Sequence, residues 1–483
     1  MKRHLVSVGR RDRDVPRQEQ LCHAIACVAA DPVAVDADVA EMAACRILDS
    51  IGVSIHGLRE PLVRHAVELA ARRPRRDGAR ILGIAPERRF DAERAGWANQ
   101  VALRARDLND MFVGAEYAHP SDSIPALIAV AQQTQASTAA LVRAIVTAYE
   151  VHVALARAIP LSRHGFDPSG HLGPALVAGL GTLRGLPLDT IRAALDHIVH
   201  LGLMPRRAPD TPPSHWRILG AAHIARLAIE VVEESVAGLR APTPAYESPE
   251  GMVGRWMGAT GVAFELQLPE PGEPRRAILA TYPKAHEAQF QAQAFIDLAI
   301  DLHATIDRRA IDTVEIRTSR RIHGQIGTAW RAGAHGTAMP APAHDLRMIF
   351  ATALEDGAWS MAPASTRAST AALVDRITTA AAPEWTVRAE STDPHQQGFG
   401  GEAIIEFLDG RRFSRSINRP RCHALEQPWT WHDYDRRFHR LCAPLATPDE
   451  IERLSRTCRD LAGLQQDTAR TPVSAAELCL SLR

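Results

Sequence analysis

The sequence predicts a mainly α-helical protein, with a large helical domain and a smaller α+β domain inserted before the C-terminal helices. Apolar residues recur at steps of three and four from about Ala30 to Arg240, which is the spacing of buried helix faces. Proline and glycine then cluster from Pro242 to Pro274, as in a connection between domains. Strand-like alternation follows before helical spacing returns. We therefore expect the helical domain at 1–270 and 425–483, and the α+β domain at 271–424.

Local patterns indicate the helices of the first domain. One helix face is marked by apolar residues at Met42, Ile47, Leu48 and Ile51. A second apolar run spans Leu141–Ile159 and stops before Pro160, since proline interrupts a helix. A third helix carries Ile191, Leu195 and Ile198, and Asp189 is its expected N-cap.

The inserted domain begins with a helix at about 286–304 and continues with strands. Thr313–Arg317 and Trp385–Glu390 both alternate between apolar and polar residues, a pattern typical of strands. Ala403–Ile417 reads as a hairpin that turns at Asp409-Gly410. These strands define the expected α+β domain.

The charge balance excludes several classes of partner. Formal net charge is +0 and the pI is about 7.4, which favours neither nucleic acid nor a membrane surface. Lys2 and Lys284 are the only lysines among 56 basic residues, so nearly all are arginine. Arginine stays charged, and an amine base therefore has almost no candidates.

The N-terminus and the cysteines bear on location. Residues 1–17 are rich in arginine and lack an apolar core, so we expect a disordered leader rather than a secretory signal. The cysteines are odd in number and scattered without a C-x-x-C pair: Cys22, Cys27, Cys45, Cys422, Cys442, Cys458 and Cys479. This argues against a disulfide framework or a structural zinc site, and cytoplasmic location is the default expectation.

Acids, a histidine and a proline are concentrated in one short segment. Arg106–Phe112 contains D-L-N-D, and Glu116–Asp122 contains H-P-S-D. The acids lie where one predicted helix ends, and Ser121 or Asp122 is placed to cap the next. On residue types alone, these acids are better explained as ordinary helix-end residues and His119 as a turn histidine.

The same segment resembles the signature of 2-methylcitrate dehydratase and its relatives in the MmgE/PrpD family. D-x-N-D and H-P-S-D stand at the matching spacing, and further landmarks follow in order: Leu48–Val53, Ala79–Gly83, Trp97–Asn99, Ala148–Val151, Gly165–Pro168, Tyr282-Pro283, Asp345–Gly357 and Asp409–Arg411. The resemblance implies a large helical domain and an α+β lid with the active site between them. It also implies a homodimer that uses no metal or organic cofactor.

Dehydration of a hydroxy polycarboxylic acid removes a proton beside a carboxylate and expels hydroxide from the next carbon. Histidine can serve as acid or base near neutral pH, and arginines bind substrate carboxylates. The resemblance carries His119 and Asp107 over as catalytic residues, with Asp110 close behind. Ser121 and Asp167 are expected substrate contacts, and aspartate at 167 matches the dehydratases rather than the decarboxylases. His171 is a further catalytic candidate, or else a packed helix histidine.

Two landmarks depart from the family pattern because lysines are missing. Ser214 stands where relatives have an active-site lysine, and the neighbouring Arg206, Arg207 and His215 are candidates to supply its positive charge. Near Tyr282-Pro283, the preceding lysine is also absent. Here Lys284, His286 and Gln289 are the expected site residues, with His286 in a catalytic role. Arg206, Arg207 and Lys284 are equally explained as exposed charges.

The sequence thus supports three hypotheses. The first is a metal-independent hydro-lyase acting on a 2-methylcitrate-like polycarboxylate. The second is a decarboxylase or epimerase of a related acid. The third is a non-catalytic binding protein that has kept the fold, motivated by the missing lysines.

Overall fold

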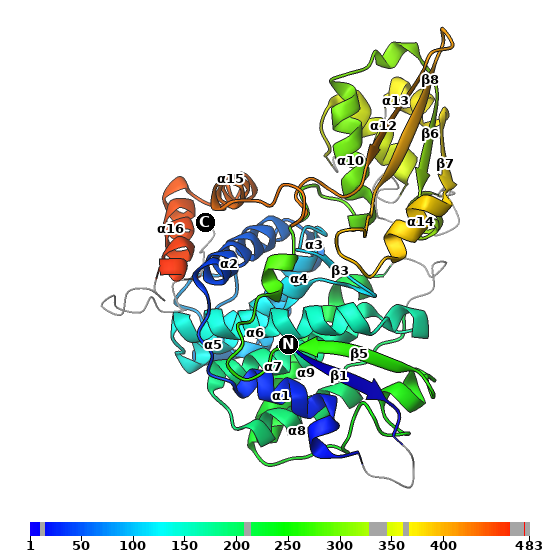
Figure 1. The fold of residues 1–483 in the computed structure, drawn as a ribbon. Helices are drawn as coiled ribbons and strands as arrows, with labels where there is room; N and C mark the ends of the chain where they lie inside the picture. The colour runs from blue at the N-terminus through cyan, green and yellow to red at the C-terminus, as the bar shows by residue number, and fades with distance from the viewer. Residues whose placement is uncertain (10–14, 207–213, 328–344, 361–366, 464–477, 479–483) are drawn as a thin grey trace. The chain divides into compact units, whose positions relative to one another are not determined.

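A computed structural model describes residues 1–9, 15–206, 214–327, 345–360, 367–463 and 478 (Figure 1). The chain forms two compact units. Among the described residues, the first unit comprises those within Met1–Arg207, His215–Thr281 and Thr430–Arg483, and the second comprises Ser214 and those within Tyr282–Trp429. The mainly α-helical fold predicted from the sequence is confirmed.

The first unit is helical and is assembled from both ends of the chain. Its regular elements are β1 (Lys2–Ser7), α1 (Leu21–Ala30), α2 (Ala37–Gly57), α3 (Pro61–Ala70), β2 (Pro74–Ala79), α4 (Ala92–Arg104), β3 (Phe112–Val113), β4 (Tyr117–Ala118), α5 (Ile124–Thr134), α6 (Thr138–Ala158), α7 (Leu172–Arg184), α8 (Leu188–Leu201), α9 (Trp216–Val236), β5 (Ala263–Leu268), α15 (Trp431–Cys442) and α16 (Pro448–Gly463). Short helices are η1 (Arg17–Glu19), η2 (Pro120–Ser123), η3 (Leu161–His164), η4 (Pro168–His171), η5 (Met252–Trp256) and η6 (Ala277–Ala280).

Helix α6 lies in the core of this unit. It is long and apolar enough to cross a membrane, but 83% of its apolar window is buried within the protein, as in the core helix of a soluble fold. It packs closely on α7, where a Cβ added at Gly179 would lie 3.0 Å from the carbonyl oxygen of Ala144. This close approach explains the small residues of α7.

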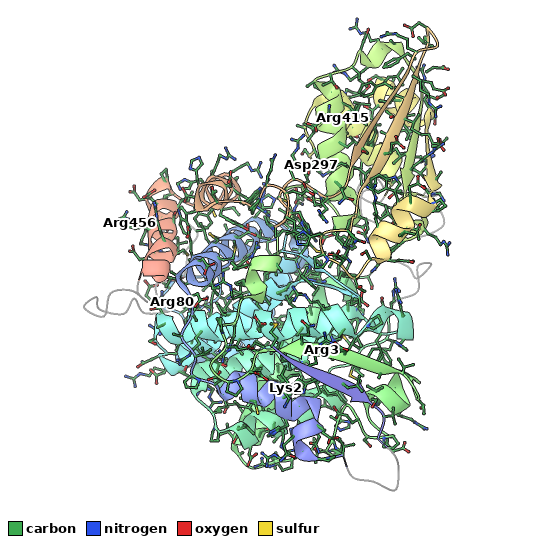
Figure 2. All side chains as sticks on the ribbon, in the orientation of Figure 1. Lys2, Arg3, Arg80, Asp297, Arg415 and Arg456 are labelled. Carbon is green, nitrogen blue, oxygen red and sulfur yellow. The ribbon has the colours of Figure 1, made fainter. Side chains whose placement is uncertain are left out.

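The expectation of a disordered leader is wrong for Lys2–Ser7. These residues form β1, which pairs antiparallel with β5 (Figure 1), and Lys2, labelled in Figure 2, lies opposite Leu268. Val6 is buried in this pairing. The arginine-rich composition did not reveal the strand because its partner lies far along the chain.

The second unit is an α+β structure. It contains α10 (Phe290–His303), η7 (Arg308–Ala310), β6 (Ile311–Thr318), α11 (Arg320–Ile322), η8 (His323–Gly327), α12 (Leu346–Asp356), α13 (Ala368–Val374), β7 (Ile377–Ala381), α14 (Pro383–Glu390), β8 (Gly401–Phe407) and β9 (Arg412–Ile417). Its sheet has the order β7-β6-β8-β9, in which β6 and β7 are parallel and the other pairs are antiparallel.

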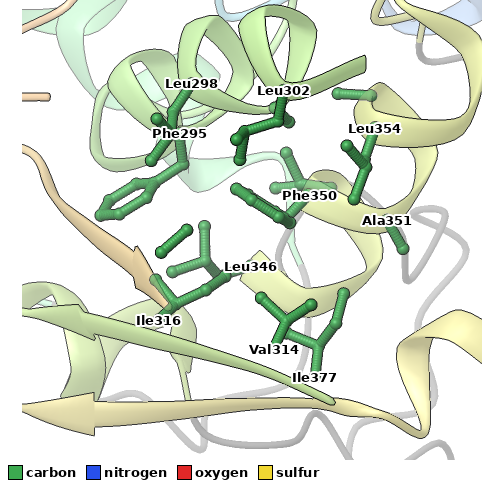
Figure 3. Packing of buried hydrophobic residues seen from close by; sticks show 14 of the residues in the cluster. Phe295, Leu298, Leu302, Val314, Ile316, Leu346, Phe350, Ala351, Leu354 and Ile377 are labelled. Atoms are coloured by element: carbon green, nitrogen blue, oxygen red, sulfur yellow. The ribbon is translucent and has the colours of Figure 1, made fainter. Parts of the chain in front are cut away.

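Helices α10 and α12 cover one face of this sheet. Phe295 of α10 and Phe350 of α12 point into a shared apolar core, and Val314, Ile316 and Ile377 enter it from the strands (Figure 3). All five side chains are almost fully buried. Burial of apolar surface at this interface stabilises the unit.

Most local predictions for the second unit are confirmed. Thr313–Arg317 lies within β6, and β8 and β9 form the hairpin, with Gly410 at a φ of 81° in its turn. The predicted strand at Trp385–Glu390 is wrong. Pro383 occupies the first turn of helix α14, a position that suits proline, and Trp385 is the buried residue of that helix.

The N-cap prediction for α8 is also wrong by two residues. Pro187 is the N-cap, and Asp189 lies in the first helical turn, where a negative charge still complements the helix dipole.

Helix α1 begins against a buried carboxyl group. The backbone N–H of Leu21 donates to Oε1 of Glu247 at 2.7 Å, and Glu247 is 2% exposed. Burial raises the pKa of Glu247 to about 7. The hydrogen bond from Leu21 partly opposes this increase in pKa, and the nearby Asp196 carboxylate adds to it. Ionising this glutamate therefore opposes folding.

We expect Glu247 to make the protein less stable as pH rises toward neutrality. Between pH 4.5, the usual value for glutamate, and about 7, the native state holds a proton that the unfolded state has lost. Stability therefore falls through that window, by about 3 kcal/mol in total at about 1.4 kcal/mol for each pH unit. Glu247→Gln keeps an acceptor for Leu21 and should flatten this fall. Urea unfolding at several pH values measures how the free energy of unfolding changes with pH. The control is Glu265→Gln, which changes an exposed glutamate. Equal pH slopes in wild type and Glu247→Gln would contradict the expectation.

Candidate active site

The candidate residues of the first unit lie on the connection between α4 and α5. The chain leaves α4 at Arg104, forms the small β3–β4 hairpin and enters α5 through η2. Asp107 has a φ of 52°, in the left-handed region that few residues other than glycine, asparagine and aspartate adopt. This turn lets the acidic segment fold back beside the helices.

Asp107 pairs with an arginine from a distant helix. Its Oδ2 lies 2.5 Å from a guanidinium nitrogen of Arg217, in the first turn of α9. The Asp107 side chain is 26% exposed and that of Arg217 is 46% exposed. A carboxylate and a guanidinium are thus held together within reach of solvent.

Arg104 and Asp122 form a more deeply buried ion pair beside it. The guanidinium of Arg104 lies 2.8 Å from Oδ2 of Asp122 and also donates to the backbone oxygen of Arg217 at 3.1 Å. Burial alone would lower the pKa of Arg104, but the carboxylates of Asp122, Asp107 and Asp167 outweigh it and raise the pKa. Arg104 is therefore a permanent cation among three acids.

Asp110 is almost fully buried, and both of its carboxylate oxygens accept hydrogen bonds. Its Oδ1 accepts the backbone N–H of Ser121 at 2.9 Å, and its Oδ2 accepts the Tyr149 hydroxyl at 2.8 Å. Arg46 lies near, with Nε 3.7 Å from Oδ2. The hydroxyl of Ser121 is buried as well, so Ser121 contributes its backbone to the site.

His119 is half-buried at the end of the β3–β4 hairpin. Its Nδ1 lies 2.7 Å from the backbone oxygen of Asp110. A carbonyl oxygen only accepts, so Nδ1 carries a proton and Nε2 is the basic nitrogen of the neutral ring. The ring of Tyr117 stands edge-on to His119 at a centroid distance of 5.9 Å. Burial and then the nearby Asp167 raise the pKa of Tyr117, which stays a neutral hydroxyl.

Asp167 and His171 occupy different surroundings. Asp167 caps η4 by accepting the backbone N–H of Ser169 at 2.9 Å, and it lies close enough to Arg104 and Tyr117 to shift the pKa of each. His171 is 1% exposed, and its Nε2 donates to the backbone oxygen of Ile159 at 2.8 Å. Burial lowers the pKa of His171, so it is held neutral in the core. This environment matches the second of the two interpretations of His171, a packed histidine rather than a catalytic one.

His286 belongs to the second unit, where it forms a dyad with Asp297 of α10. Its Nε2 lies 2.9 Å from Oδ1 of Asp297, and the other oxygen of Asp297 accepts the backbone N–H of Arg421 at 2.8 Å. Gln289 is the N-cap residue of α10. A carboxylate that orients an imidazole is a common arrangement in acid–base sites.

Comparison with known families matches nearly the whole chain. Residues 19–265 match the MmgE/PrpD N-terminal domain, and residues 286–461 match the MmgE/PrpD C-terminal domain. The chain belongs to the MmgE/PrpD family. Members of this family are generally lyases of the dehydratase kind, and the resemblance found in the sequence is confirmed.

Other residues stand near the positions where the family resemblance implies lysine. Ser214 and His215 are exposed, and Arg206 is exposed with its guanidinium on the backbone oxygen of Ser162 at 3.2 Å. Arg207 lies outside the described residues. Lys284 is 1% exposed, so its reading as a merely exposed lysine is wrong.

Sequence reasoning missed the cations that hold the site. Arg104, Arg217 and Arg46 were not candidates, although Arg104 stands three residues before Asp107. Its position just upstream of the acidic motif was the one available signal. Among the described residues, no group of three histidine, cysteine or acidic side chains is arranged to hold a metal ion.

The first unit also has a recess, but none of the predicted site residues line it. It is lined by Ser50, Ile51, Ser54, Arg80, Leu82, Asn99, Ile124, Pro125, Ile128, Gln132 and Leu478. Ile124 and Pro125 begin α5, one residue after the H-P-S-D segment ends.

We expect Asp122→Asn to lower the free energy of unfolding by about 3 kcal/mol, because it leaves the largely buried Arg104 without its direct counter-ion. Glu230→Gln is the matched control. It breaks the more exposed Arg226–Glu230 pair of α9 and should cost less than about 0.5 kcal/mol. Denaturant unfolding of both variants measures the difference, and equal small losses would show that Arg104 does not depend on Asp122.

Proposed function

We propose that this chain is a metal-independent hydro-lyase that dehydrates a 2-methylcitrate-like hydroxy polycarboxylic acid by side-chain acid–base catalysis. The observation that carries the proposal is His119, half-buried and oriented through Nδ1 by a backbone carbonyl. Membership of the MmgE/PrpD family supports the reaction class.

His119 transfers the proton through Nε2. One carbon beside a carboxylate loses a proton, the neighbouring carbon loses hydroxide, and a carbon–carbon double bond forms between them. Histidine suits either transfer because its pKa lies near neutrality. With Nδ1 committed to Asp110, the ring keeps one orientation throughout.

Arginines supply the positive charge. The developing charge on the substrate carboxylate needs fixed cations or donors nearby. Arg217 is the accessible guanidinium beside Asp107, and we assign it the binding of a substrate carboxylate. Arg104 contributes a second cation from a more buried position. His286, Lys284 and Gln289 of the second unit remain proposed contributors, as do Arg206, Arg207, Ser214 and His215.

The dehydratase proposal rests also on Asp167. Its carboxylate lies within electrostatic range of Arg104 and Tyr117, so it is part of the same charged group as Asp107. Aspartate at this position resembles the dehydratases rather than the decarboxylases. This resemblance is why we propose dehydration rather than decarboxylation or epimerisation.

We expect wild-type protein mixed with 2-methylcitrate to show rising ultraviolet absorbance from a new conjugated alkene. His119→Gln should lower kcat by about 10²- to 10⁴-fold, the usual contribution of a general acid or base. The exposed His432→Gln is the control and should leave the rate unchanged.

Other outcomes distinguish the alternatives. Release of carbon dioxide from an aconitate-like acid would identify a decarboxylase, and solvent deuterium uptake without alkene formation would identify an epimerase. Inertness toward every di- and tricarboxylate tested would contradict an enzymatic role and favour a binding protein.

We also propose a homodimer, as the family resemblance implies, and a cytoplasmic location, as the scattered cysteines favour. Light scattering of the purified chain should then give twice the monomer mass of 52.6 kDa. A single species at the monomer mass over the micromolar range would contradict the dimer.

A further inference from the structure

The buried carboxylate of Asp110 holds together segments that are far apart in the sequence. Its two oxygens accept from Ser121 of η2 and from Tyr149 of α6, at 2.9 and 2.8 Å. Arg46 of α2 supplies the compensating charge, with Nε at 3.7 Å. A carboxylate that is 1% exposed needs such partners, because an uncompensated buried charge is strongly unfavourable.

Arg46 is itself fixed by the segments that border the second unit. One guanidinium nitrogen donates to the Tyr434 hydroxyl of α15 at 2.7 Å, and the other donates to the backbone oxygen of Thr281 at 2.7 Å. Thr281 is the last residue before the second unit, and Tyr434 follows closely after it ends. Arg46 is 1% exposed. The charge beside Asp110 is therefore immobilised from two directions.

A second arginine reaches the same segment from α15. Arg437 donates to the backbone oxygen of Leu108 at 3.0 Å, two residues before Asp110. Its Nε lies 3.3 Å from Oδ1 of Asp49 in α2, and both side chains are buried. Helix α15 thus supports the acidic segment at its backbone through Arg437 and at its carboxylate through Tyr434 and Arg46.

We propose that Asp110 is a positioning residue, and that the network of Arg46, Tyr149 and Tyr434 holds its backbone carbonyl against His119 so that His119 keeps the Nδ1–H tautomer. The carboxylate is occupied by its own partners, while the carbonyl of the same residue meets the imidazole at 2.7 Å. The inference deepens the proposed function, since it assigns Nε2 as the proton-transferring atom.

This assignment separates two roles that the acidic motif combines. Asp107 lies in a partly exposed pair with Arg217, where a substrate can reach it. Asp110 is buried, and it would affect a reaction only by orienting His119. Loss of one hydroxyl from the network then loosens the carbonyl and lets the ring sample the other tautomer.

The test is nitrogen-15 NMR of histidine-labelled protein without substrate, in which a His119→Gln spectrum identifies the His119 signals. In wild type above the histidine pKa, Nδ1 should be protonated and Nε2 unprotonated. Tyr149→Phe removes only the hydroxyl that donates to Asp110, and should change the ratio of the two tautomers by about tenfold, the equivalent of one hydrogen bond of about 1.4 kcal/mol. The control is Tyr246→Phe, a buried tyrosine of the same unit with a different environment.

An Nε2–H tautomer in wild type would overturn the proposal. The proposal would also be overturned if Tyr149→Phe and Asp110→Asn both gave the His119 signals of wild type. These two variants change the network from opposite sides, so either one still serves as the test if the other fails to fold. An equal shift in Tyr246→Phe would also overturn it, because the effect would then be unspecific. The measurement needs no substrate: the expected tautomer without any dehydration activity would overturn the proposed function alone.

Discussion

The structure around the candidate site depends on placing one negative charge, that of Asp110, where water does not reach it. A carboxylate in this position is stable only with hydrogen-bond donors and a cation in fixed geometry. Ser121, Tyr149 and Arg46 meet this need, and each belongs to a different element. Satisfying the charge therefore determines how α2, α6 and the H-P-S-D segment pack. The position of His119 follows from that packing.

Arginine gives this site a different electrostatic character from one built on lysine. The cations of this site are Arg104, Arg217 and Arg46, and a guanidinium binds its partners in planar, directional geometry. Lysine, in contrast, loses its proton readily when buried and can then act as a base. The family resemblance implies one lysine at position 214 and another just before Tyr282-Pro283. This chain has Ser214 at the first position and no lysine at the second. The proposed mechanism therefore assigns the proton transfer of the first unit to His119.

The sequence predicted what local patterns encode. The helical spacing, the β8–β9 hairpin and the His119 and Asp107 motif all depend on residues close together in the chain. The Arg104–Asp122 pair and the Arg46–Tyr434 contact could not be predicted, because a single arginine carries no sign of its partner. Trp385–Glu390 was misjudged for a related reason. Its alternation fits a strand, but Pro383 starts a helix whose single buried side chain suffices to anchor it. The catalytic and substrate-binding roles of all the predicted site residues, in both units, stay predictions.

The division of the helical unit between both ends of the chain has a consequence for biosynthesis. Domains generally fold as units while the ribosome extends the chain from the N-terminus. Residues 282–429 are complete before Tyr434 and Arg437 emerge, so the inserted unit can acquire its structure first. The acidic segment receives its last supports only when α15 has been translated. A nascent chain truncated before that helix would keep every residue of the D-x-N-D and H-P-S-D motifs and still lack the scaffold that orders them.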